Sequence, residues 1–203
     1  MRTLRNLADR SVPLLLAVAL AAAAPGAARA ALIPCLSGFV SDSNGNPVAN
    51  GALDFTISAT GVRIITPGDN TDAFGFYTVC VLPNVYDVAF APPPGTRLMG
   101  KIIPGVSLLA DPGLELDVTL ETGTVLSGVV RDAAGAPVGT VDLDVDRVSG
   151  GRIYTPGDSS DPVTGAYRVV VPDDLYRLRY EPPRGSRLRG VEMDSVTVAG
   201  DLQ

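Results

Sequence analysis

The chain has 203 residues, of which 46% are hydrophobic, with 22 Gly, 17 Pro and no His. Its formal net charge of −6 at pH 7 disfavours nucleic acid or an anionic membrane surface as a partner. The absence of His excludes Ser-His-Asp and Cys-His nucleophile arrangements and any His-ligated metal site. The composition is typical of a globular, turn-rich β protein.

The first 30 residues have the pattern of a secretory signal peptide. Arg2, Arg5 and Arg10 precede a short apolar run at residues 12–24, and Ala28-Arg29-Ala30 fits a cleavage site. The apolar run is shorter than the roughly 20 residues of a membrane span, which disfavours an uncleaved anchor. We therefore expect an exported bacterial protein that is periplasmic, on the cell surface or secreted, without stable membrane insertion after cleavage.

The rest of the chain contains one sequence twice. LSGFVSDSNGNPVANGALDFTI, from Leu36, aligns with LSGVVRDAAGAPVGTVDLDVDR, from Leu126, at an offset of 90 residues. A period of this length is that of whole domains rather than of a solenoid repeat. The sequence therefore predicts a signal peptide at 1–30, a first domain at 31–123 and a second domain at 124–203.

Alternating apolar and polar residues predict a series of short antiparallel strands in each copy. In the first copy the side chains expected to face the core are Leu36, Gly38, Val40; Leu53, Phe55, Ile57; Tyr77, Val79, Val81; and Tyr86, Val88, Phe90. Further strands are expected at residues 62–66, 101–109 and 114–120. In the second copy the inward rows are Val141, Leu143, Val145; Tyr167, Val169, Val171; and Tyr176, Leu178, Tyr180. Seven strands in about 90 residues predict a Greek-key sandwich, so the expected fold is all-β, with two tandem seven-stranded sandwiches.

The second copy ends before the counterpart of its last strand. Val196 aligns with Val106 and Asp201 with Asp111, but nothing corresponds to LELDVTL at residues 114–120. A second sandwich without its last strand has an open sheet edge. Three explanations remain: the sequence is a fragment, the sandwich tolerates six strands, or a partner donates a strand at this C-terminal edge.

Two pairs of segments carry a resemblance to a known family. SGFVSDSNGNPVANGALDF and SGVVRDAAGAPVGTVDLDV resemble the opening of carboxypeptidase regulatory-like domains, which are transthyretin-like (prealbumin-like) sandwiches, and are similar to collagen-adhesin B-type modules. GFYTVCVLPNVYDVAF and GAYRVVVPDDLYRLRY resemble the core hairpin of that family. The resemblance implies an accessory, adhesive or spacer role, and the related carbohydrate-binding sandwiches make a sugar ligand conceivable. No isopeptide cross-link is expected, because Lys101 is the only lysine.

Acidic residues gather in loops that strands of alternating direction place at one end of each sandwich. The loops cover residues 42–47, 66–74 and 91–100, and then 132–137, 155–164 and 181–190. The candidate ligand or calcium-binding residues are Asp42, Asp69, Asp72, Arg97, Asp132, Asp158, Asp161 and Arg187. Ca²⁺ needs six to eight oxygen ligands, and the spacing does not match a D-x-D-x-D-G loop. The alternative is that the aspartates cap turns and that each arginine bridges an Asp or a carbonyl of a neighbouring loop. A role for the arginines in binding an anionic or sugar ligand also remains open.

A second acidic group lies along one predicted strand. Asp142, Asp144 and Asp146 alternate, so successive carboxylates are about 7 Å apart on one face, which is too wide for one compact metal site. Arg177 and Arg179 occupy the same parity on another strand. We expect a solvated face or a face where these charges pair across the sheet.

The two cysteines of the chain, Cys35 and Cys80, both fall on the outward parity of their strands. In an exported protein they predict one disulfide, and the alternative is two free thiols. The aligned residues of the second copy are Val125 and Val170, so the bond is expected in the first copy alone.

These patterns predict a non-catalytic exported structural or protein-interaction module. The alternative is a carbohydrate- or calcium-binding accessory domain that uses the loops at one end of each sandwich. Partners are expected among proteins or glycans outside the cytoplasm, and no cofactor is expected apart from the Ca²⁺ of the alternative. An enzyme would need a carboxylate pair in a pocket, and no spacing indicates one.

Overall fold

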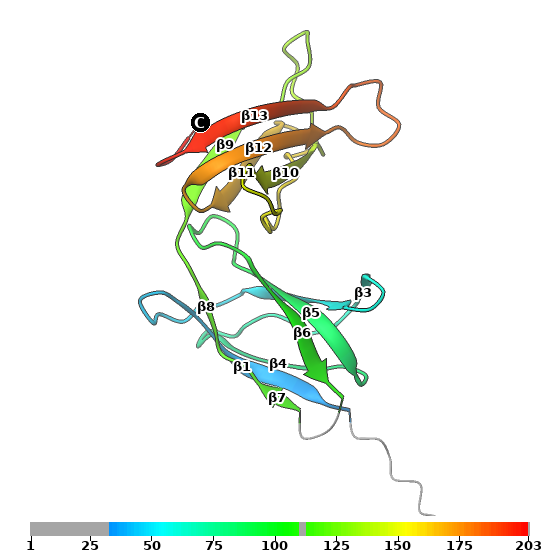
Figure 1. Ribbon diagram of the computed structural model, residues 1–203, viewed down its shortest axis with the longest axis vertical. Coiled ribbons are helices and arrows are strands. Elements are labelled where there is room, and N and C mark those ends of the chain that lie inside the picture. The colour runs from blue at the N-terminus through cyan, green and yellow to red at the C-terminus, as the bar shows by residue number, and fades with distance from the viewer. Residues whose placement is uncertain (1–32, 110–112, 203) are drawn as a thin grey trace, which may run out of the picture. The chain divides into compact units, whose positions relative to one another are not determined.

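The computed structural model describes residues 33–109 and 113–202. The predicted signal peptide at residues 1–30 lies outside these described residues. Within them the regular secondary structure consists of thirteen β-strands (Figure 1). The same residues contain no helix with the length and apolar character that a membrane span requires. The predicted all-β class is confirmed.

The first copy forms a sandwich of two sheets. Its strands are β1 (Cys35–Asp42), β2 (Ala52–Ile57), β3 (Val62–Ile64), β4 (Phe76–Cys80), β5 (Asn84–Ala91), β6 (Lys101–Leu108), β7 (Leu114–Glu115) and β8 (Val118–Leu120). One sheet has the order β4-β1-β7, with β8 also paired to β1, and the other has the order β3-β2-β5-β6. Side chains from both sheets form one buried cluster between them.

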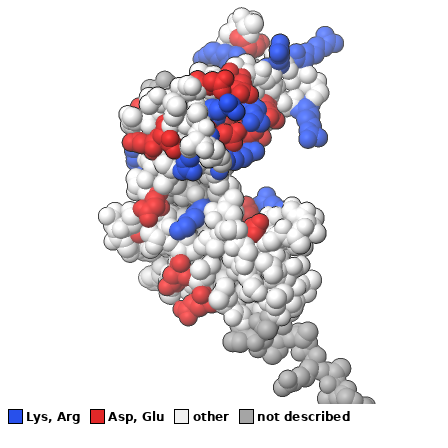
Figure 2. All heavy atoms as spheres, viewed as in Figure 1, with Lys and Arg blue, Asp and Glu red and all other residues white. Residues whose placement is uncertain are grey.

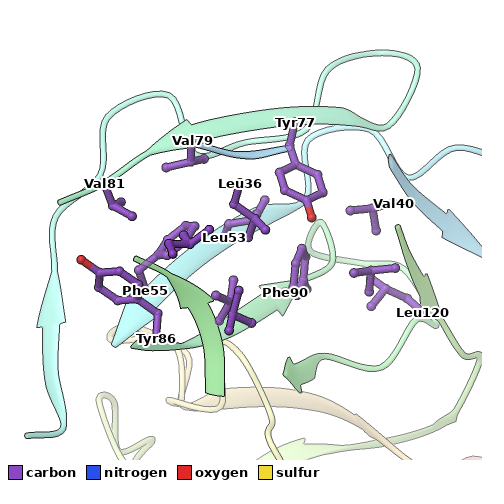
Figure 3. Close-up of a cluster of buried hydrophobic side chains, with 14 of the residues drawn as sticks. Leu36, Val40, Leu53, Phe55, Tyr77, Val79, Val81, Tyr86, Phe90 and Leu120 are labelled. Atoms are coloured by element: carbon purple, nitrogen blue, oxygen red, sulfur yellow. The ribbon is translucent and has the colours of Figure 1, made fainter. Parts of the chain in front are cut away.

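Most side chains of the inward rows predicted from alternation are buried, whereas Ile57, Tyr167 and Tyr180 are half-buried. In β4, Tyr77 and Val79 are buried while the residues between and beside them are exposed. In β5, Tyr86, Val88 and Phe90 are buried, and the residues between them are half-buried. Figure 3 shows Tyr77, Val79, Tyr86 and Phe90 from these rows around Leu36 and Leu53. The core therefore follows directly from the period of two.

The last strand of the first copy differs from the alternation-based prediction. It is divided into β7 and β8, and both pieces run parallel to β1, where antiparallel strands are predicted. Between β7 and β8, hydrogen bonds from side chains replace main-chain hydrogen bonds between strands. The Asp117 carboxylate accepts a hydrogen bond from Phe39 N at 2.8 Å, and the Tyr77 hydroxyl donates one to Leu116 O at 2.5 Å. Gly38 permits this approach, because a Cβ there would lie 2.1 Å from Leu116 O.

The second copy forms a smaller sandwich with its own core. Its strands are β9 (Thr124–Val129), β10 (Asp142–Arg147), β11 (Ala166–Val171), β12 (Asp174–Glu181) and β13 (Val191–Val198). The sheets have the orders β11-β9 and β10-β12-β13. Where the first copy has β3, the second copy has a single antiparallel β-bridge between Asp146 and Arg152. Where the first copy has the start of β7, the second copy has a single parallel β-bridge between Leu126 and Leu202. Its buried cluster shares no residue with the first, as expected for tandem sandwiches.

The predicted pairing of charged rows in the second copy is confirmed. Asp144 lies opposite Arg179 and Asp146 opposite Arg177 in the β10–β12 register. Arg179 contacts both aspartates, whereas Arg177 contacts Glu192 and Asp194 of β13. Acidic and basic side chains gather in one mixed patch of the surface (Figure 2). Asp144 is buried rather than solvated, and Arg152 also pairs with it.

Candidate functional site

The first copy brings the three predicted loops to one end of its sandwich. Val40 N donates to Gly75 O and Val48 N donates to Val40 O, so the loop at 42–47 lies against the turn at 72–75. Ala52 pairs with Ala91 in β5 and forms a bridge with Asn70. The middle of the loop at 66–74 and the start of the loop at 91–100 therefore lie beside the same residue. We call the loops at residues 42–47, 66–74 and 91–100 the first loop end.

Two aspartates of the first loop end hold turns. Asp42 Oδ1 accepts hydrogen bonds from Asn44 N at 2.9 Å and from Asn46 N at 2.8 Å, and Oδ2 accepts one from the Asn46 side chain. Asp72 Oδ1 accepts from Phe74 N and Phe76 N at 2.8 and 2.9 Å. The bonds from Asn46 hold the pKa of Asp42 below its ordinary value. Both side chains thus satisfy backbone donors of their own loops.

The second copy repeats this arrangement. Asp132 Oδ1 accepts from Ala134 N and Ala136 N, both at 2.9 Å. Asp161 Oδ1 accepts from Val163 N, Thr164 N and the Thr164 hydroxyl. The hydrogen bonds from Thr164 are the main reason why the pKa of Asp161 is lowered.

Asp69 and Asp158 form a second matched pair. The Thr66 hydroxyl donates to Asp69 Oδ2 at 2.6 Å, and the Thr155 hydroxyl donates to Asp158 Oδ2 at 2.8 Å. Both threonines are buried, so each Asp fixes a buried hydroxyl at the start of its loop. Burial raises the pKa of Asp158, with its Thr155 hydrogen bond acting in the opposite direction.

The two candidate arginines have different surroundings. Arg97 donates to both carboxylate oxygens of Asp201, at 2.5 and 2.7 Å, and to Gly123 O at 3.4 Å. Arg187 is exposed, and no ion pair or hydrogen bond to its side chain is found among residues 33–109 and 113–202. Of the two arginines, Arg97 therefore bridges an Asp and a carbonyl, as the alternative to ligand binding predicts, whereas Arg187 makes no such contact among the described residues.

The fit of the loops to Ca²⁺ can be judged from their donor atoms. No group of three or more acidic, His or Cys side chains suited to a metal ion occurs in the described part of the chain. Ca²⁺ requires six to eight oxygens. In four of the six candidate aspartates, Oδ1 already accepts two or more hydrogen bonds from loop donors. Calcium binding at these loops stays a prediction for titration to test.

The predicted disulfide is confirmed. Cys35 and Cys80 lie directly opposite each other in the β1–β4 register and are bonded, with their Cα atoms 3.9 Å apart. Val125 and Val170 are opposite each other in β9 and β11, as the alignment predicts. The covalent link therefore joins two strands of the first sandwich, at a site where the second has two valines.

A second candidate site lies on β9, at the open sheet edge that the sequence predicts for the second copy. We call the side of residues 127–131 that faces away from β11 the β9 edge. Two tyrosines lie in the adjacent core, with the hydroxyls of Tyr167 and Tyr180 2.9 Å apart. The sequence signal was the replacement of Phe90 by Tyr180, which places a polar group in an otherwise apolar inward row.

Neither a scan against protein-family models nor a search of curated proteins finds a match. Solved structures of low similarity are found. The Bacillus anthracis TIE protein matches with 11% identity and a TM-score of 0.35, over 84% of this chain and 32% of that one. The Streptococcal ancillary pilin matches with 13% identity and a TM-score of 0.34, over 84% of this chain and 61% of that one. Shaft pilin SpaA from Lactobacillus rhamnosus GG matches with 9% identity and a TM-score of 0.31, over 83% of this chain and 95% of that one. The chain thus spans about a third of the length of the Bacillus anthracis TIE protein. The fold of this chain is assigned from its own strand order and register.

Proposed function

We propose that the chain is a non-catalytic, exported structural and protein-interaction module of the carboxypeptidase regulatory-like type. In this proposal it consists of two sandwich domains, at residues 31–123 and 124–203. The single observation that carries the proposal is that the loop aspartates are already engaged in hydrogen bonds within their own turns. Asp42 and Asp72, with Asp132 and Asp161, accept hydrogen bonds from their own turns. Side chains engaged in this way make the loops rigid rather than reactive.

The disulfide supports export. Cys35–Cys80 is a bond of the kind that persists in oxidising compartments and is rare in reducing ones. It joins neighbouring strands on the surface of the first sandwich, where it contributes to stability without taking part in a polar site. This placement agrees with a protein that must endure outside the cytoplasm, in the periplasm, on the cell surface or in the medium.

The alternative function is a carbohydrate- or calcium-binding accessory domain. It would use the same loop residues, with Arg97 and Arg187 as groups for an anionic or sugar ligand. A ligand that binds the folded state raises the melting temperature by mass action. The two functions therefore predict different responses to added ligand.

Thermal melts of the purified chain distinguish them. Melts are recorded with Ca²⁺, with EDTA and with a panel of glycans. The proposed function predicts that the melting temperatures stay the same in all three conditions. A rise that depends on the concentration of Ca²⁺ or of one glycan, and that is lost in an Asp42→Asn, Asp132→Asn variant, would contradict the proposal and favour the alternative.

A further inference from the structure

The sequence Asn-Gly occurs twice in the first copy, at residues 44–45 and 50–51. The aligned pairs of the second copy are Ala134-Gly135 and Thr140-Val141, and no asparagine occurs among residues 124–203. Glycine lacks a Cβ, so its main-chain nitrogen approaches the side-chain amide of a preceding asparagine with little hindrance. An Asn-Gly pair is therefore prone to deamidation, and the fold decides whether each of the two pairs reacts.

The first of these pairs, Asn44-Gly45, lies at the surface of the first loop end. Both residues are exposed, and no atom lies within 4 Å of a Cβ built on Gly45. Asn44 N donates to Asp42 Oδ1 at 2.9 Å, and Gly45 N donates to Asp42 O at 3.0 Å. Both bonds end on one residue of the same turn, and none of the residues 42–46 belongs to the buried core. Opening of this turn is therefore the kind of local opening that costs little free energy.

The second pair, Asn50-Gly51, is held by a buried side chain. Gly51 is buried, and its N–H donates to Thr71 Oγ1 at 2.8 Å. Thr71 is 3% exposed, and its hydroxyl donates in turn to Val48 O at 2.6 Å. Two main-chain bonds join the same segments, because Thr71 N donates to Gly51 O at 2.8 Å and Asn50 N donates to Thr71 O at 3.0 Å. Release of Gly51 N therefore requires the separation of two segments that lie 20 residues apart in the sequence.

The two glycine nitrogens thus differ in what must move before they can react. Gly45 N is released when one exposed turn opens. Gly51 N is released only when the buried Thr71 leaves its hydrogen-bond partners. The same bonds hold the main chain of Asn50 in the left-handed region, with φ at +58°. The same dipeptide therefore has a reactive setting and a protected setting within one sandwich.

We propose that Asn44 is a site of spontaneous deamidation in the folded chain and that the bonds to Thr71 protect Asn50. Gly45 N forms a bond to Asn44 Cγ, the Cγ–Nδ2 bond breaks, and the glycine proton leaves with that nitrogen as ammonia. Water then adds to either carbonyl carbon of the resulting succinimide ring and opens the ring to aspartate or isoaspartate. Water is the only co-reactant, and the step needs no oxidant or reductant.

The modification changes the first loop end and leaves the aligned loops of the second copy as they are, because Ala134 occupies the position of Asn44 there. Either product adds a negative charge close to the Asp42 carboxylate, and like charges at this distance repel. Isoaspartate also adds a methylene to the main chain, which displaces Gly45 N from Asp42 O. The turn at residues 42–47 is therefore loosened in the first copy alone. The site does not depend on the proposed function.

Peptide mapping by mass spectrometry tests the site. The purified chain is kept at mildly alkaline pH in buffer and, in parallel, in concentrated guanidinium chloride, and samples are digested after increasing times. Fragment spectra locate the conversion of an amide to an acid at Asn44 or at Asn50. A Thr71→Val variant removes the hydroxyl that accepts from Gly51 N, and Thr71→Ser is the matched control that keeps the hydroxyl. Thermal melts establish that each variant is folded before it is mapped.

The proposal predicts that Asn44 converts about tenfold or more faster than Asn50 in the folded chain, because only the exposed turn opens readily. In denaturant the two sites convert at similar rates, because the dipeptides are the same. Thr71→Val raises conversion at Asn50, whereas Thr71→Ser does not. Equal rates at the two sites in the folded chain, an unchanged Asn44 while the denatured chain converts, or the same preference in denaturant would each overturn the proposal. Unchanged conversion of Asn50 in a folded Thr71→Val variant would overturn it as well, and the parent chain alone decides the other outcomes.

Discussion

The hydroxyl of Tyr167 shares a hydrogen bond with the hydroxyl of Tyr180 at 2.9 Å. In the first sandwich the aligned Tyr77 donates to Leu116 O at 2.5 Å, and the residue aligned with Tyr180 is Phe90. The two sandwiches thus satisfy the hydroxyl of the aligned tyrosine in two ways, with a main-chain carbonyl or with a second side chain. Burial, followed by the Tyr167 hydrogen bond, raises the pKa of Tyr180. Among the described residues of the second sandwich, the pair therefore takes the place of the bond that Tyr77 makes to Leu116 O.

Replacement of Tyr77 by Phe tests the bond to Leu116. The change leaves the ring in place but removes the donor, so we expect the free energy of unfolding to fall by about 1 kcal/mol. Urea unfolding of the variant measures the loss. The matched control is Tyr167→Phe, whose partner Tyr180 is half-buried and can turn to water, so a smaller loss is expected. Equal losses in the two variants would contradict this difference between the sandwiches.

The disulfide is expected to stabilise the first sandwich selectively. Cys35 and Cys80 are 45 residues apart in the sequence, and a loop of this size corresponds to about 4 kcal/mol in the chain-entropy description. Scanning calorimetry of a Cys35→Ala, Cys80→Ala variant should show a lower transition for the first sandwich only. The Val125→Ala, Val170→Ala variant controls for lost side-chain volume at the aligned sites. A shift of the same size in both variants would show that the bond itself contributes little.

Gly75 is expected to tolerate no side chain. Its φ is +76°, and a Cβ there would lie 2.4 Å from Val40 O. Gly45 is a matched control, because its φ is +82° but no atom lies within 4 Å of a Cβ built there. Gly45→Ala should cost about 1 kcal/mol from the backbone conformation alone, and Gly75→Ala about 2 kcal/mol or more because the clash is added. Urea unfolding that ranks the two variants equally would show that the β1 backbone at Val40 moves aside without cost.

Asp161 should make the stability of the second sandwich depend on pH. Its folded-state pKa is lowered by hydrogen bonds from Thr164, so folding favours the ionised form. The contribution is present above the unfolded-state pKa and is lost as the pH falls through the folded-state pKa. Asp161→Asn keeps an oxygen acceptor but does not titrate. The difference in unfolding free energy between the parent chain and the variant should therefore shrink between about pH 5 and pH 2. A difference that stays constant over this interval would mean that Asp161 does not titrate in the turn as described.

Alternation in the sequence was sufficient to predict the cores. Tyr77 and Val79 on β4, and Tyr176 and Leu178 on β12, face inward as expected, because the strand period is two and one face of each sheet is covered. The Cys35–Cys80 pairing followed from parity and compartment. Each of these features depends on residues within one or two strands.

The features that alternation could not predict depend on contacts between distant segments. The parallel direction of β7 and β8 requires Asp117 and Tyr77 to replace strand hydrogen bonds beside Gly38. The contact of Arg97 with Asp201 spans 104 residues, and no local pattern indicates it. The loop aspartates were recognised as a group, but their use as turn acceptors is set by backbone geometry. With a different backbone geometry, aspartates at the same spacing could have pointed into solvent.

Amide hydrogen exchange of two aligned residues tests the open β9 edge most directly. Phe39 N donates to Asp117, whereas the N–H of Val129 faces the open side of β9. We predict that in the free chain the amide of Phe39 is protected and that of Val129 exchanges rapidly. Protection of Val129 in the free chain equal to that of Phe39 would contradict the account, because it would show that the β9 edge is already paired.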